Sequence, residues 1–195
     1  MRGSTITILA LSLALIAGCS AGTETVVVNS GISTGHGKRS YPSMGVTMAS
    51  FKTSFNSFMQ DAASKKKALL PPQQLETDGE LSFSFPDHTS LRVFAADRKS
   101  VSQLVMVGNS NHPQQLWCCT EAMISALNPA ITAGDRQTIL TKLGKRNTDD
   151  IPTAEAKFES GMVEYSFNRN GDRWILQGFP SMKATEDEIR RLRPE

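Results

Sequence analysis

Residues 80–85 read Glu-Leu-Ser-Phe-Ser-Phe, a strict alternation of polar and apolar side chains. Successive side chains of a β-strand point to opposite faces, so this pattern predicts a strand with one buried face. The polar residues 87–89, Asp-His-Thr, follow as a turn, and a second alternating run covers residues 91–95. A third run covers residues 103–108 after another polar turn. The three runs predict an antiparallel meander.

Helical periodicity flanks this meander on both sides. Upstream, apolar side chains recur every three or four residues within 51–62, which predicts a helix over about 47–64. Downstream, apolar residues within 116–127 share one helical face, and Pro129 interrupts the pattern. The meander is therefore expected to lie between two amphipathic helices.

A further helix after Pro129 carries its own start and stop signals. Thr132 followed by Asp135 is typical of an N-cap with an acidic residue in the first turn. Gly144 is typical of the residue just beyond a helix C-terminus. These signals predict a short helix between residues 132 and 144.

The C-terminal part of the chain predicts a second set of strands and a last helix. Val163, Tyr165 and Phe167 alternate with polar residues and mark a buried strand face. Thr185 with Glu188 predicts the N-cap of the last helix. The strands are expected over about 154–159, 162–168 and 172–178.

The order of these elements, α-βββ-αα-βββ-α, predicts the fold class. It indicates an α+β domain in which helices pack on one face of an antiparallel sheet of about six strands. We expect a single domain over residues 46–195, since about 150 residues bury a core without disulfides or metals.

The N-terminus has the features of a secretion signal. Met1-Arg2 supplies a positive charge, and residues 6–16 are almost wholly apolar. This run is shorter than the ~20 residues that span a bilayer as a helix, so it predicts a signal peptide over residues 1–18.

Residues 16–19, Ile-Ala-Gly-Cys, resemble the lipobox of bacterial lipoproteins. The resemblance implies that Cys19 carries a diacylglycerol, that cleavage falls before it, and that the membrane is a partner through this lipid. Ser20, rather than Asp, favours the outer membrane over the inner. An ordinary signal peptide with an incidental cysteine, or a short membrane anchor, are the alternatives. The globular part, through residues such as Asn128-Pro129, resembles small uncharacterised lipoproteins of the bacterial envelope.

Residues 19–45 are rich in Gly, Ser and Thr. Such a composition predicts a flexible linker behind the lipidated cysteine, with a reach of roughly 25–30 Å. The apolar residues 26–28, Val-Val-Val, leave a short edge strand as an alternative. We therefore expect the domain to be held to the membrane by a tether.

Cys118 and Cys119 are the most unusual pair in the domain. They could pack as small apolar residues on a buried helix, which is common for free cysteine. They could instead form a strained disulfide between neighbours, react as thiols, bridge to another molecule, or ligate a metal with His112. A metal site needs three or four well-spaced ligands, so neither a metal nor another cofactor is expected.

No catalytic motif accompanies these cysteines. His88 and His112 are candidate bases for a thiol, but both lie in turn-like surroundings. Trp174 alternates with Leu176 and is expected in the core rather than at an exposed binding site. We therefore expect no catalytic residues and do not expect an enzyme.

The charge balance bears on the partner. The 21 Lys and Arg residues nearly match the 19 Asp and Glu residues, which gives no reason to expect nucleic acid. The expected function is a lipid-anchored, non-catalytic binding or accessory module of the envelope, with a protein or small-molecule partner. The alternatives are an inhibitor or immunity lipoprotein against a toxin or lysozyme, and a thiol-dependent enzyme that uses Cys118 or Cys119.

Overall fold

A computed structural model describes residues 32–33, 39–40, 42–65, 73–147 and 155–192. Four helices and nine strands lie in these ranges. The helices are α1 (Met48–Ser64), α2 (Pro113–Leu127), α3 (Ala133–Lys142) and α4 (Met182–Leu192). The strands are β1 (Ile32–Ser33), β2 (Arg39–Ser40), β3 (Gln73–Thr77), β4 (Glu80–Ser84), β5 (Ser90–Phe94), β6 (Gln103–Asn109), β7 (Ala156–Ser160), β8 (Val163–Asn170) and β9 (Arg173–Pro180).

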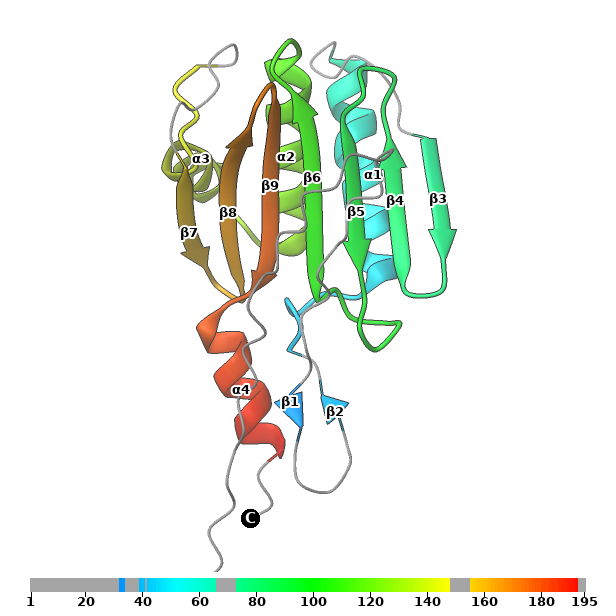
Figure 1. Cartoon of the computed structure of the whole chain (residues 1–195), viewed down its shortest axis with the longest axis vertical. Helices are drawn as coiled ribbons and strands as arrows, with labels where there is room; N and C mark the ends of the chain where they lie inside the picture. Colours follow the sequence, from blue (N-terminus) through cyan, green and yellow to red (C-terminus); the bar gives the residue numbers. More distant parts are fainter. Residues whose placement is uncertain (1–31, 34–38, 41, 66–72, 148–154, 193–195) are drawn as a thin grey trace, which may run out of the picture.

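Seven strands form one antiparallel sheet in the order β3-β4-β5-β6-β9-β8-β7. Two meanders, β3 to β6 and β7 to β9, meet where β6 pairs with β9. Helices α1, α2 and α3 lie together on one face of the sheet, and α4 continues from the end of β9 (Figure 1). The predicted α+β class and element order are confirmed, with seven strands in the sheet instead of about six.

Helix α1 covers the half of the sheet formed by the first meander. Phe51, Phe55 and Met59 lie on one side of α1 and are almost fully buried. The ring of Phe55 packs against that of Phe83 on β4, with centroids 4.5 Å apart. The apolar side chains of α1 and those of residues 80–85 thus bury each other.

Helix α2 covers the second meander through a stack of aromatic rings. Trp117 stacks on Phe167 of β8 at 5.6 Å, and Phe167 stacks on Trp174 of β9 at 5.2 Å. Gly108 on β6 allows α2 to come close, because a Cβ there would lie 2.7 Å from a methyl group of Leu116. The large side chains of this contact are all buried, namely Leu116, Trp117, Phe167 and Trp174. The expected core position of Trp174 is confirmed.

The predicted ends of α3 are confirmed. The Thr132 side chain accepts a hydrogen bond from the Asp135 backbone N–H at 3.1 Å. At the other end Gly144 has a φ of 97° and donates to the Thr141 carbonyl, while Lys145 donates to the Leu140 carbonyl. This pair of bonds satisfies the last carbonyls of the helix.

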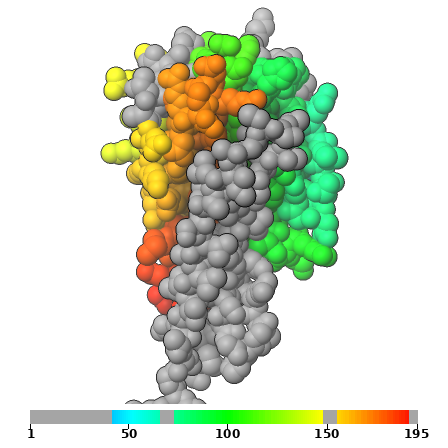
Figure 2. All heavy atoms as spheres, in the orientation of Figure 1, coloured from blue at the N-terminus to red at the C-terminus, as the bar shows by residue number. Residues whose placement is uncertain are grey.

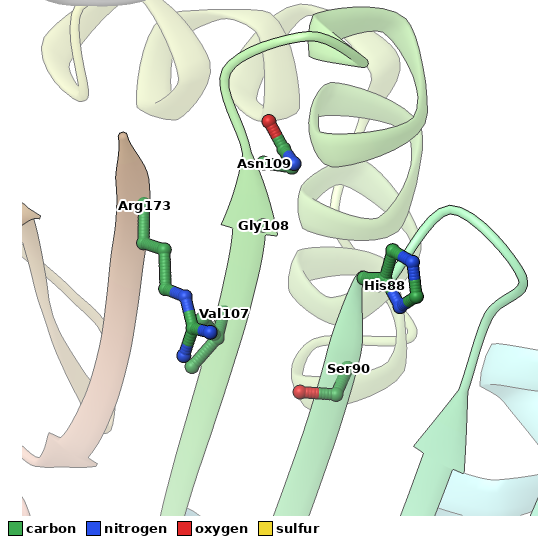
Figure 3. Close-up of a pocket in the computed structure, with 6 residues that line it drawn as sticks. All are labelled: His88, Ser90, Val107, Gly108, Asn109 and Arg173. Atoms are coloured by element: carbon green, nitrogen blue, oxygen red, sulfur yellow. The ribbon is translucent and has the colours of Figure 1, made fainter. Parts of the chain in front are cut away.

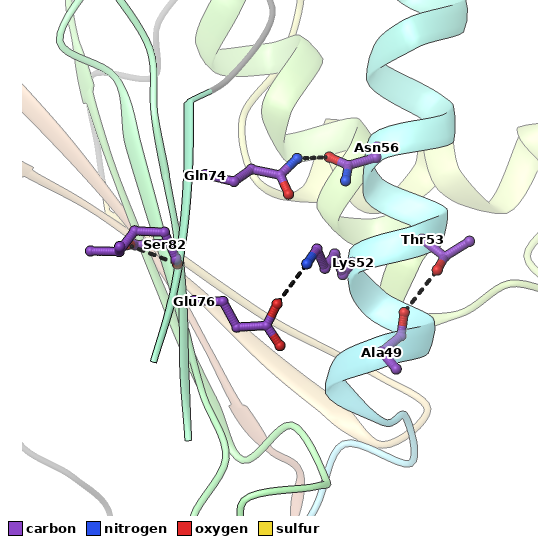
Figure 4. A network of polar contacts seen from close by, with 8 residues as sticks. Ala49, Lys52, Thr53, Asn56, Gln74, Glu76 and Ser82 are labelled. Carbon is purple, nitrogen blue, oxygen red and sulfur yellow. Dashed lines mark hydrogen bonds and ion pairs between the residues drawn. The ribbon is translucent and has the colours of Figure 1, made fainter. Parts of the chain in front are cut away.

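The sequence patterns missed strand β3. Every residue from Gln73 to Thr77 is exposed, so the strand lacks the alternation that reveals a buried face. Two polar contacts join this edge strand to α1, namely Lys52 with Glu76 at 2.6 Å and Asn56 with Gln74 at 2.6 Å (Figure 4). The position of β3 against α1 therefore depends on polar contacts and not on the burial of apolar side chains.

The predicted start of the last helix is wrong by one turn. Helix α4 begins at Met182, and Ser181 accepts a hydrogen bond from the Ala184 N–H at 3.2 Å. Ser181 also donates to the Gly161 carbonyl at 3.0 Å, and it is fully buried. This second bond joins residues that are distant in the sequence, so no local pattern reveals Ser181 as the N-cap. Thr185 with Glu188 is the stronger N-cap signal in the sequence alone.

The segment predicted as a linker contributes to the described structure. Strand β1 pairs with β2 inside it. Further along, Met44 is 1% exposed and its N–H donates to the Val101 carbonyl at 2.8 Å. The alternative strand at residues 26–28 and the lipidation residue Cys19 lie outside the described residues.

Candidate functional site

Helix α2 carries the cysteine pair in the interior of the protein. Cys118 is 9% exposed, Cys119 is fully buried, and neither forms a disulfide. The helix continues without interruption through the pair, and the Gln115 side chain donates to the Cys119 sulfur at 3.4 Å. The pair is therefore packed into the domain core, and the two sulfurs are not bonded to each other.

The surroundings of Cys119 oppose its ionisation. Burial raises the pKa of the Cys119 thiol well above its ordinary value, and Cys118 and the Asp87 carboxylate raise it further. Because the thiolate is the nucleophile and the metal ligand, this environment favours the inert, protonated form. Within the ranges that the structure describes, no group of three or more His, Cys, Asp or Glu side chains could hold a metal ion.

The two candidate bases lie at the surface ends of elements. His112 is the residue before α2 and makes no side-chain capping bond. His88 lies in the turn between β4 and β5, and its φ of 67° falls in the left-handed region. His112 is thus separated from Cys118 by more than one turn of α2.

The face of the sheet opposite α1, α2 and α3, which we call the open face, presents the alternate side chains of all seven strands. Figure 2 views this face, with the β8–β9 hairpin in orange and the β3–β4 hairpin in blue-green at the right. Arg92 and Glu80 form an ion pair on it at 2.7 Å, and Leu75 is 65% exposed. The strand register aligns one row of side chains across it: Leu75, Ser82, Arg92, Val105, Gln177, Ser166 and Lys157.

One end of the open face holds a pocket of about 380 Å³, which we call the end pocket. It lies where β5 begins, β6 ends and β9 begins, since antiparallel strands bring these three ends together. In Figure 3 the side chain of Arg173 extends from β9 alongside Val107, with Ser90 across from it. The lining residues are His88, Ser90, Val107, Gly108, Asn109 and Arg173.

The polar side chains of the end pocket are mainly hydrogen-bond donors. Arg173 brings five N–H donors and no acceptor, and Ser90 brings a hydroxyl. The Asn109 side-chain oxygen already accepts the Asn111 N–H at 2.9 Å, so its amide nitrogen is the atom that can serve a ligand. Among the residues that the structure describes, no carboxylate lines the pocket.

A second cavity, of about 400 Å³, lies between α3 and the edge strand β7. Ile131, Ile139 and Phe158 give it an apolar lining, and Asp135 contributes a carboxylate. Since Asp135 also accepts the Thr132 hydroxyl at 2.7 Å, this carboxylate serves the N-cap of α3.

Sequence reasoning did not find the end pocket. The sequence offers His88 as a turn residue and a candidate base for a thiol, and Ser90, Asn109 and Arg173 are isolated polar positions in separate strands. The available signal was the alternation itself, because it places Ser90 and Arg173 on the face away from the core. That β5, β6 and β9 are neighbours is not visible in any local pattern.

Comparison with known proteins adds no assignment. The chain matches no protein-family model, and neither curated proteins nor solved structures show a significant similarity to it. Among the residues that the structure describes, none of the helices combines the length and the hydrophobicity needed to cross a bilayer.

Proposed function

We propose that the protein is a lipoprotein of the bacterial envelope that works as a non-catalytic binding module. The lipid on Cys19 holds it at the membrane, the outer membrane rather than the inner, and the domain binds a protein or a small molecule. The observation that carries the binding role is the open face, a broad strand surface on which none of the helices α1, α2 and α3 packs.

The composition of the open face supports this role. Its rows mix apolar side chains such as Val105 and Ile175 with polar and charged ones such as Gln177 and Arg92. Surfaces that associate reversibly have a similar mixture, with about the same apolar share as the rest of a protein surface. The buried, protonated state of Cys119 favours binding over a thiol reaction.

The lipobox residues support the anchor. A single acyl chain binds a membrane only marginally, whereas two or more chains on one residue hold a protein firmly. Cys19→Ala should abolish incorporation of labelled palmitate and leave an unprocessed or soluble protein in cell fractionation. Cys118→Ala is the matched control, because it removes a thiol outside the lipobox and should fractionate like the wild type. Wild-type behaviour of Cys19→Ala would refute the anchor.

The binding role is tested by photocrosslinking in cells. A photoreactive residue at Asn170, which is exposed on β8 beside the open face, should capture a partner. The same residue at Gln60, which is exposed on α1, is the control for random collisions. Equal capture at both positions, or none at Asn170, would count against the open face. Mass spectrometry of the captured species would identify a toxin, a lysozyme or another partner.

A further inference from the structure

We propose that the end pocket binds an anionic group, the phosphate or carboxylate of a small molecule. This inference rests on the proposed binding function and names the chemistry of one ligand of the open face. It starts from the donor side chains that three strands contribute to the lining of one pocket, Ser90 of β5, Asn109 of β6 and Arg173 of β9.

Arg173 supplies the positive charge and the geometry. A guanidinium presents two parallel N–H donors that match two oxygens of a carboxylate or a phosphate, and such charge-assisted pairs are the strongest hydrogen bonds in proteins. Arg173 is in register with Asn109 on β6, so the two side chains leave the sheet side by side on the same face. From there the Arg173 side chain extends to Val107, so the cation and the amide donor lie at two different points of the same pocket.

The other two donors lie across the pocket. Ser90 is paired with Val107, which places its hydroxyl on the same face one row away from Asn109. His88 comes two residues earlier, and its φ of 67° sets it in a region that favours glycine. The chain therefore keeps an imidazole where a glycine would be unstrained, at the rim of the pocket.

Within the part of the chain that the structure describes, the neighbouring carboxylates do not oppose an anion strongly. Asp87 is 9% exposed, and its two oxygens accept the Thr89 N–H at 3.1 Å and the Thr89 hydroxyl at 2.9 Å. Glu80, at the far end of the neighbouring β4, is paired with Arg92. Asp172 precedes Arg173 in the β8–β9 turn, outside the lining of the pocket.

The size of the pocket limits the ligand to a small one. About 380 Å³ lies at the low end of the volumes found for ligand pockets, ~300–1,000 Å³. Val107 gives the pocket an apolar wall, and the donors lie around it. This arrangement fits a phosphate or carboxylate that carries a short organic part.

The test is a titration of the full-length protein, in nonionic detergent, followed by amide chemical shifts at constant ionic strength. Inorganic phosphate and acetate should shift the amides of Ser90, Asn109 and Arg173, while chloride should not. Glycerol 3-phosphate distinguishes a phospholipid headgroup from a free anion. Tighter binding than phosphate would assign the pocket to a headgroup-like ester, and equal binding would assign it to the free anion.

Two variants locate the site. Arg173→Gln should weaken phosphate binding about tenfold, the loss expected for one charge-assisted hydrogen bond. His88→Gly should weaken it about threefold and should not lower stability, because glycine tolerates the positive φ.

Arg98→Gly is the matched control for both variants. Arg98 has a φ of 63°, lies at the opposite end of β5 and pairs with Asp78 at 3.2 Å. Arg98→Gly removes a cation, as Arg173→Gln does, and relieves a positive φ, as His88→Gly does. Phosphate binding should nevertheless be unchanged. Equal weakening by Arg173→Gln and Arg98→Gly, or no shifts in the pocket, would overturn the inference. Such a failure leaves the test at Cys19 standing, and it also leaves the test at Asn170, which is paired with Arg173 but does not line the pocket.

Discussion

The approach of α2 to the sheet depends on Gly108, and its replacement by alanine tests that packing. A Cβ at this position would lie 2.7 Å from Leu116 Cδ1 and 3.5 Å from Leu116 Cβ and Cγ. Leu116 is fully buried, so it cannot turn into solvent to make room. Forcing an extra methyl group into a packed core reduces stability by about 1–3 kcal/mol. Replacing a flexible glycine in a strand by alanine raises the free energy of unfolding by about 0.5–1 kcal/mol, which offsets part of this loss.

Gly108→Ala should therefore lower the free energy of unfolding by about 1–2 kcal/mol. Urea unfolding of the full-length protein in nonionic detergent, followed by tryptophan fluorescence, measures this change. Both tryptophans, Trp117 and Trp174, are buried and report on the α2 side of the core. The midpoint should fall by roughly 0.5–1 M, since a chain of this size has a slope of about 2 kcal/mol per M.

Two other glycines separate the contact from the backbone. Gly134→Ala in the first turn of α3 would meet only the Thr132 hydroxyl oxygen, at 3.8 Å, and should raise stability by up to about 1 kcal/mol. Gly161→Ala meets nothing within 4 Å but has a φ of +60°, so strain alone should lower stability by about 1 kcal/mol. A Gly108→Ala midpoint equal to or above that of the wild type would refute the packing argument.

Two further predictions concern buried titratable groups. Because Cys119 is fully buried and burial raises the pKa of its thiol, a maleimide should label Cys119 in the native protein at least about a hundredfold more slowly than in urea. Prompt native labelling of Cys119 would favour a thiol enzyme. Burial also raises the pKa of Tyr165 above its ordinary value of 10.0, so its contribution to stability is full below about pH 10 and is lost as the pH rises further. Tyr165→Phe should flatten the alkaline fall of the urea midpoint, and an unchanged pH profile would exclude this cause.

Elements with local signals were predicted correctly from the sequence. The alternation of residues 80–85 defines β4, and Thr132, Asp135 and Gly144 mark the ends of α3 within a few residues of the helix itself. In each case the stabilising interactions join residues close in the chain, so the pattern and the structure report the same physics.

The predictions from the sequence are wrong where a contact between residues distant in the chain determines the local structure. Strand β3 is set by pairing with β4 and by polar contacts between Glu76 and Lys52 of α1, so its own residues show no pattern. The start of α4 is set by Ser181, which bonds to Gly161 on the neighbouring hairpin. The cysteines had several open interpretations, and only the packing around α2 shows that both thiols are buried and that neither forms a disulfide.

The sequence by itself determined the α+β class and the order of the helices and strands, because both depend on short-range periodicity. The tertiary structure decided which strands are neighbours, and through that the end pocket. Ser90, Asn109 and Arg173 come together only because β6 pairs with both β5 and β9. Such a site depends on pairing between distant segments, which is driven by burial of the whole core rather than by any local run of residues.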